Sequence, residues 1–213
     1  LALEIQKEQL GPSHVDVAIS YNNLGTVCGK TGDLRKEKEY YQLALEISNE
    51  ELGPDHVVVA TFYNNLGLVY SKTGDLENAK QYIQLALEIL KEQLGSKHAS
   101  VATSYNNLGS VCSDTGDFEK AKEYIQLALE IQKEQFGTKH ASVATSYNKL
   151  GLVYNDTGDS EKAKEYIQLA LEIQKEQFGP KHPSVATSYN NLATVYDDTG
   201  DFEKAKEYQT VST

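Results

Sequence analysis

The sequence predicts an all-α protein made of stacked antiparallel helical hairpins. Two observations predict it: a 42-residue repeat runs through the whole chain, and the apolar residues of each repeat follow helical spacing. The 213 residues hold five such repeats and three further residues. Each of the five histidines lies 42 residues from the next: His14, His56, His98, His140 and His182. A period of this length is typical of an array in which one supersecondary unit is stacked repeatedly.

Residues 98–139 show how one unit is built. From Val101 to Cys112 the apolar residues recur at spacings of one and three, which indicates a helix rather than a strand. Thr115-Gly116-Asp117 then interrupts the pattern, because Gly116 suits the position after a helix and Asp117 suits the N-cap of the next one. A second stripe continues to Phe136 and predicts a helix of roughly 18 residues, about 27 Å long.

The same pattern sets the expected organisation of the chain as a single array over residues 1–213. We expect one half-helix, four complete hairpins and one partial hairpin, at residues 1–11, 14–52, 56–94, 98–136, 140–178 and 182–208.

Glycines inside the first helices predict close helix packing. Glycine costs about 1 kcal/mol relative to alanine in a helix interior, so its recurrence at Gly25, Gly67, Gly109 and Gly151 indicates that the partner helix approaches there. We expect the contacts at Ala79, Ala121 and Ala163. Glu37 stands where the other repeats have alanine, and we expect it to splay the first hairpin or to turn outward.

Composition excludes several classes of partner. With 20 basic and 31 acidic residues the net charge is −11, which disfavours binding to nucleic acid or to an anionic membrane surface. No apolar run approaches the roughly 20 residues of a membrane span. Cys28 and Cys112 lie two repeats apart, too far for a disulfide. We interpret both as small buried residues of a cytoplasmic protein in a reducing compartment.

No pattern in the sequence predicts catalysis, a metal or a cofactor. Histidines one repeat apart cannot converge on one ion, so we interpret them as loop or cap residues. The Thr-Gly-Asp turns lack the Gly-Lys-Ser/Thr of a phosphate loop. The acidic residues pair with lysines at helical spacing, as Glu119 does with Lys122, which is typical of solvated faces. We therefore expect a protein that is not an enzyme.

The pattern Ala102-x-x-Tyr105-x-x-Leu108-Gly109, followed by Gly116-Asp117-Phe118-x-x-Ala121 and Ala128-Leu129, resembles the tetratricopeptide repeat. The segment Leu52-Gly53-Pro54-Asp55-His56 is similar to the 42-residue repeats of kinesin light chains. The resemblance implies a right-handed superhelical solenoid, with each helix about one turn longer than in 34-residue repeats. It also implies a scaffold that binds a protein or peptide on the concave face formed by the first helices.

The candidate binding residues are those of the first helices that lie outside the apolar stripe. An asparagine recurs in every repeat, and two turns later a position changes from lysine to aspartate along the chain. These candidates are Asn22, Lys30, Asn64, Lys72, Asn106, Asp114, Asn148, Asp156, Asn190 and Asp198. Amide groups can hydrogen-bond an extended peptide, although plain solvation of an exposed face accounts for them as well. The charge order places an acidic part of the ligand near Lys30 and Lys72. A second asparagine series, beginning at Asn23, is expected to tie neighbouring hairpins together.

A structural array is the alternative hypothesis. The sequence starts within a second helix and stops within another, so head-to-tail self-association would cover two incomplete hairpins. Residues 99–140 and 141–182 are identical at 36 of 42 positions. Four of the differences, including Asn107/Lys149 and Ser110/Leu152, fall in the first helix, and this variation favours binding.

Overall fold

The computed structural model describes residues 2–211, and over that range it contains eleven α-helices and no strand. The helices alternate between 16 and 19 residues from the second to the tenth. They are α1 (Ala2–Leu10), α2 (Val15–Lys30), α3 (Leu34–Leu52), α4 (Val57–Lys72), α5 (Leu76–Leu94), α6 (Ala99–Asp114), α7 (Phe118–Phe136), α8 (Ala141–Asp156), α9 (Ser160–Phe178), α10 (Pro183–Asp198) and α11 (Phe202–Val211). The predicted all-α fold is confirmed.

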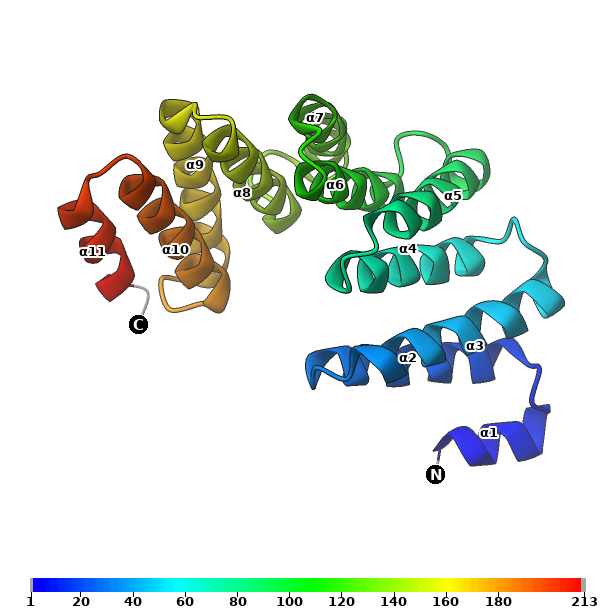
Figure 1. Cartoon of the computed structure of the whole chain (residues 1–213). Coiled ribbons are helices and arrows are strands. Elements are labelled where there is room, and N and C mark those ends of the chain that lie inside the picture. The colour runs from blue at the N-terminus through cyan, green and yellow to red at the C-terminus, as the bar shows by residue number, and fades with distance from the viewer. Residues whose placement is uncertain (1, 212–213) are drawn as a thin grey trace. The chain divides into compact units, whose positions relative to one another are not determined.

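The chain divides into two compact units, residues 1–111 and 112–213, with the boundary inside α6. In the first unit α2 packs with α3, and α4 packs with α5. In the second unit the hairpins are α8 with α9 and α10 with α11, and α7 packs against α8 (Figure 1). Consecutive hairpins of one unit also pack together, through α3 with α4 in the first and α9 with α10 in the second.

Each hairpin turns through the Thr-Gly-Asp sequence, as predicted. Gly158 has a φ of +81°, which an L side chain rarely adopts, and it lies between α8 and α9. Asp159 caps the second helix by accepting a hydrogen bond of 3.2 Å from the backbone N–H of Lys162. The turn therefore ends one helix and starts the next within three residues.

The histidines cap the first helices. The Nδ1 atom of His182 accepts a hydrogen bond of 3.2 Å from the backbone N–H of Ser184, and the other four histidines accept the equivalent bond. Accepting at Nδ1 requires an unprotonated nitrogen. The predicted cap role of the histidines is confirmed.

Glycines within the first helices allow the close approach that was expected. A Cβ on Gly67 would meet the Ile83 side chain and lie 3.0 Å from the carbonyl oxygen of Ala79, and Gly151 stands in the same relation to Ile167 and Ala163. A side chain at either glycine would therefore push the two helices of its hairpin apart.

Candidate functional site

The asparagines predicted to line a ligand groove are largely inside the protein. Asn64, Asn106 and Asn148 are buried, Asn22 is half-buried, and Asn190 is exposed. The expectation of an open ladder of amide groups is therefore wrong at the three buried positions. At Asn64 and Asn148 the physical reason is that the following first helix of the same unit hydrogen-bonds the amide.

Two of the buried amides, those of Asn64 and Asn148, bond to serines of the following first helix. The Nδ2 atom of Asn64 donates to the Ser104 hydroxyl at 2.8 Å, and Asn148 donates in the same way to Ser188 at 2.7 Å. The Ser188 hydroxyl in turn donates to Gln174 Oε1 at 2.6 Å. These bonds satisfy polar groups that are costly to bury alone, so they hold adjacent hairpins in register.

The second asparagine series joins the same contacts. Asn65 donates to Asn22 at 2.7 Å, and Asn191 donates to Asn148 at 3.4 Å, 43 residues earlier in each case. The expected role of this series in tying hairpins together is confirmed at these positions. Lys149 interrupts the series and is half-buried; burial lowers its pKa, while the charge of Asp114 acts in the opposite direction.

Two exposed positions of each first helix lie about one turn and about two turns after the first asparagine of that helix. The first position carries Leu68 and Leu152, whose exposed fractions are 37 % and 38 %, in hairpins whose neighbours have serine or threonine there. The second position carries the predicted charge series, and all five of its members are exposed: Lys30, Lys72, Asp114, Asp156 and Asp198. Asp198 accepts a hydrogen bond of 2.6 Å from Asn155.

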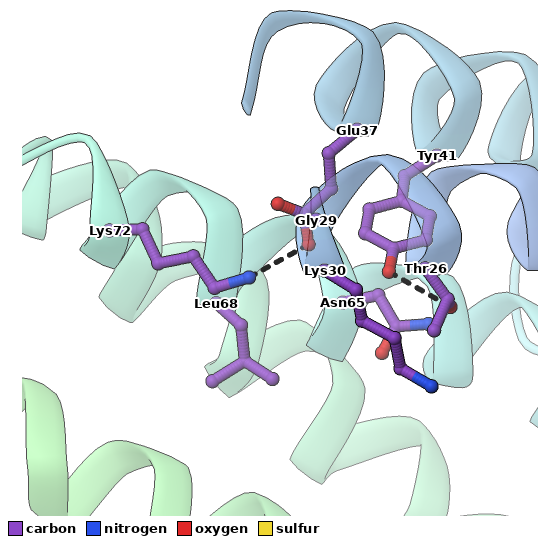
Figure 2. A pocket seen from close by; sticks show the side chains of 8 residues that line it. All are labelled: Thr26, Gly29, Lys30, Glu37, Tyr41, Asn65, Leu68 and Lys72. Carbon is purple, nitrogen blue, oxygen red and sulfur yellow. Dashed lines mark hydrogen bonds and ion pairs between the residues drawn. The ribbon is translucent and has the colours of Figure 1, made fainter. Parts of the chain in front are cut away.

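A cavity of about 250 Å³ opens on this face in the first unit. Figure 2 shows its walls, which come from α2, α3 and α4: Thr26, Gly29, Lys30, Glu37, Tyr41, Asn65, Leu68 and Lys72. The Tyr41 hydroxyl lies 3.2 Å from Thr26 Oγ1, and burial raises the pKa of Tyr41. The predicted residues Lys30 and Lys72 thus belong to one cavity.

Glu37 was expected to splay its hairpin or turn outward, and the outward placement is wrong. Its side chain is only 4 % exposed, and Oε1 accepts a hydrogen bond of 2.8 Å from Lys72 Nζ. Glu37 fits inside because the facing residue is Gly29; a Cβ there would collide with the carboxylate. The sequence reasoning missed this pair, which a joint inspection of the two unusual residues in repeat one could have indicated.

The described residues offer neither a metal centre nor a membrane span. Within residues 2–211, no group of three or more His, Cys, Asp or Glu side chains is placed to hold a metal ion. No helix in that range is long and apolar enough to cross a membrane. Cys112 is buried, as predicted, and Cys28 is half-buried.

Comparison with known proteins identifies the family. The family model described as Tetratricopeptide repeat matches residues 1–50, 38–92, 58–134, 100–175 and 142–213. The chain belongs to the tetratricopeptide repeat family. Among curated proteins, no sequence matches it significantly.

Solved structures of other proteins share its fold. BtubC (BKLC) from P. vanneervenii matches with a TM-score of 0.78 and 28 % identity, over 98 % of this chain and 83 % of that one. The putative kinesin light chain repeats of Podosopora anserina match with a TM-score of 0.73 and 22 % identity, over 93 % and 94 % of the two chains. The apo form of RapI matches with a TM-score of 0.72 and 22 % identity, over 92 % and 68 %. The resemblance to kinesin-light-chain-like repeats is therefore confirmed.

Proposed function

We propose that the chain is a non-enzymatic scaffold that binds a protein or peptide on the exposed face of its first helices. The proposal rests on the positions at which the sequences of the repeats differ. The capping turns and the buried apolar positions repeat closely. The exposed position of Leu68 and Leu152 alternates with serine or threonine, and the charge series changes once, from lysine to aspartate. A surface that varies on a constant framework is typical of selective binding.

Within this proposal the asparagines have two roles. Asn64 and Asn148 are buried and bond to the next first helix, so they stabilise the helices that form the face. Asn106 is buried as well. Asn190 is exposed and can contact a ligand directly. The exposed charges give the two units different ligand preferences, with lysines in the first unit and aspartates in the second.

The net charge of −11 favours a protein or peptide ligand over nucleic acid or an anionic membrane. The spacing of Cys28 and Cys112, two repeats apart, argues against a disulfide and is compatible with the reducing cytoplasm, in which we expect the scaffold to work.

Selection from a random peptide library tests this function. Peptides are selected on the immobilised chain, and their affinities are then measured for two double variants. Leu68→Ser with Leu152→Ser changes the proposed face and should weaken binding, and the serine natively present at the equivalent Ser110 indicates that the fold tolerates it. Leu43→Ser with Leu85→Ser is the control, because these leucines are equally exposed but lie on second helices. Equal losses in both variants would contradict the proposal.

Head-to-tail association is a second candidate, supported by exposed apolar groups on α1 and α11. Ile5 is 46 % exposed, whereas its equivalent Ile47 is half-buried and Ile89, Ile131 and Ile173 are each 8 % exposed. Phe202 is 67 % exposed. Sedimentation velocity over a range of concentrations tests it. Association that weakens in Phe202→Ser supports this candidate, and a monomer at all concentrations opposes it.

A further inference from the structure

The carboxylate of Glu37 is buried with only one of its two oxygens hydrogen-bonded. Oε1 bonds to Lys72, but Oε2 is buried and has no hydrogen-bond partner among the described residues. An ionised carboxylate offers about four lone-pair sites, and a buried charge is costly unless further hydrogen bonds satisfy it. The carboxylate therefore has unused capacity to accept hydrogen bonds from a second donor.

This arrangement belongs to the first hairpin alone among the five repeats. The residue equivalent to Glu37 is alanine in each of the others, and the residue equivalent to Gly29 is Ser71, Ser113, Asn155 or Asp197. Since a side chain at position 29 would collide with the carboxylate, the glycine and the glutamate depend on each other. Two linked departures from a close repeat indicate a purpose that the other hairpins do not share.

Lys72 separates the carboxylate from solvent on the cavity side. Its side chain is 47 % exposed, so water can rehydrate the ammonium once another cation takes its place on the carboxylate. Lys30 also lines the cavity, but Figure 2 shows its side chain directed away from Glu37. Removal of the Lys72 ammonium therefore opens a direct path from the cavity to the carboxylate.

We propose that this cavity binds an arginine side chain of a protein or peptide partner, whose guanidinium replaces the Lys72 ammonium on Glu37. A guanidinium presents parallel N–H groups that bond both oxygens of one carboxylate, whereas an ammonium is a point donor. Leu68 offers an apolar surface for the stem of the arginine, and the Tyr41 ring lies in the cavity wall. The inference rests on the proposed binding function and specifies its ligand chemistry.

The charge order in the sequence predicted the opposite ligand chemistry, with an acidic group of the ligand near Lys30 and Lys72. The structure favours arginine because the charge of Lys72 is already engaged by Glu37, which leaves one lysine of the cavity for an anion. The unused acceptor capacity is on the carboxylate, and a second carboxylate cannot satisfy it.

Methyl NMR titration with blocked tripeptides tests the inference. Acetyl-Ala-Arg-Ala-amide is compared with the same peptide carrying citrulline, lysine or aspartate in the middle, with Leu68 and Thr26 as reporters. The arginine peptide should shift both reporters saturably and bind at least roughly tenfold more tightly than the citrulline peptide, which has the same shape without the charge. Leu152 and Thr194 report on the second unit, where alanine replaces the glutamate, and should not shift.

Variants distinguish an arginine site on Glu37 from binding elsewhere on the chain. Lys72→Gln should strengthen arginine binding roughly threefold or more, because it removes the internal competitor. Glu37→Gln, or Glu37→Ala if the first variant does not fold by circular dichroism, should abolish binding. Arg35→Gln, an exposed charge change on α3 outside the cavity, should leave it unchanged.

Three results would overturn the inference. The aspartate peptide could bind more tightly than the arginine peptide, or the arginine and citrulline peptides could bind equally. The Lys72→Gln variant could also bind the arginine peptide more weakly than the wild type does. If library-selected peptides shift Leu152 while no tripeptide shifts Leu68, the arginine site fails and the scaffold function stands.

Discussion

The side-chain amide of Asn148 donates a 2.7 Å hydrogen bond to the hydroxyl of Ser188, 40 residues later in the chain. That hydroxyl donates in turn to Gln174 at 2.6 Å, so three helices of two hairpins share one buried polar chain. All three side chains are buried. Helices α8, α9 and α10 are thus fixed by direction-specific bonds as well as by apolar contact.

Removal of the central hydroxyl should be costly. Ser188→Ala leaves the amide of Asn148 and the carbonyl of Gln174 without this partner, and we expect the free energy of unfolding to fall by about 1–3 kcal/mol. Thr187→Ala, at an exposed neighbour, should change it by less than about 0.5 kcal/mol. Urea denaturation followed by circular dichroism measures both, and equal effects would contradict the role given to Ser188.

Gly29 and Glu37 should be strongly coupled. Gly29→Ser inserts a side chain against a buried carboxylate and should destabilise the protein by about 1–3 kcal/mol. In the Glu37→Ala background the same substitution should instead stabilise, because serine has a higher helix propensity than glycine. Ser71 and Ala79 already form that combination in the next hairpin. A double-mutant cycle measures the coupling, and additive effects would show that the two residues are independent.

Ser48 should tolerate the loss of its hydroxyl. It is fully buried, and its oxygen has no hydrogen-bond partner among residues 2–211. Ser48→Ala should therefore leave the free energy of unfolding unchanged or raise it by up to about 1 kcal/mol. Ser146→Ala is the matched comparison, because that hydroxyl donates to Gln132 at 2.6 Å, and it should destabilise. A loss at Ser48 as large as that at Ser146 would contradict this account.

Acid should remove one stabilising cap contact. The side-chain and backbone hydrogen bonds from Lys162 hold the pKa of Asp159 below its usual value of 3.8. A lowered folded-state pKa means that Asp159 contributes stability above pH 3.8 and loses that contribution as the pH falls through the folded-state pKa.

Asp159→Asn keeps a capping oxygen but cannot titrate. The wild type should be the more stable protein at neutral pH, and its advantage should shrink below pH 3.8. Denaturation midpoints across this range measure the difference, which should stay constant if Asp159 has no pH-dependent role.

The hairpins were predictable because their signals are local. Each Thr-Gly-Asp turn combines a left-handed glycine with a capping aspartate, and both act on the residues beside them in sequence. The close packing at Gly67 was also predictable, because glycine in a helix interior costs free energy and its presence there indicates that a partner helix approaches closely.

The burial of the asparagines depends on contacts 40 to 43 residues away and was not predictable from one repeat. Asn64 looks polar and unattached in its own helix, and only the neighbouring first helix brings Ser104 to it. The burial of Glu37 likewise required a facing glycine and a lysine 35 residues later. Comparison of positions 14 residues apart could have indicated part of the network, since Gln132 pairs with Ser146 and Gln174 with Ser188.

The proposed binding face is tested most directly by locating a bound ligand on the chain. A library-selected peptide carrying a nitroxide label is added to the chain, and paramagnetic broadening of methyl signals is measured. If the ligand lies on the first helices, the signals of Leu68 or Leu152 should broaden, while those of the similarly exposed Leu43 and Leu85 on the second helices should stay sharp. Broadening at Leu43 and Leu85, with Leu68 and Leu152 unaffected, would contradict the proposed binding face.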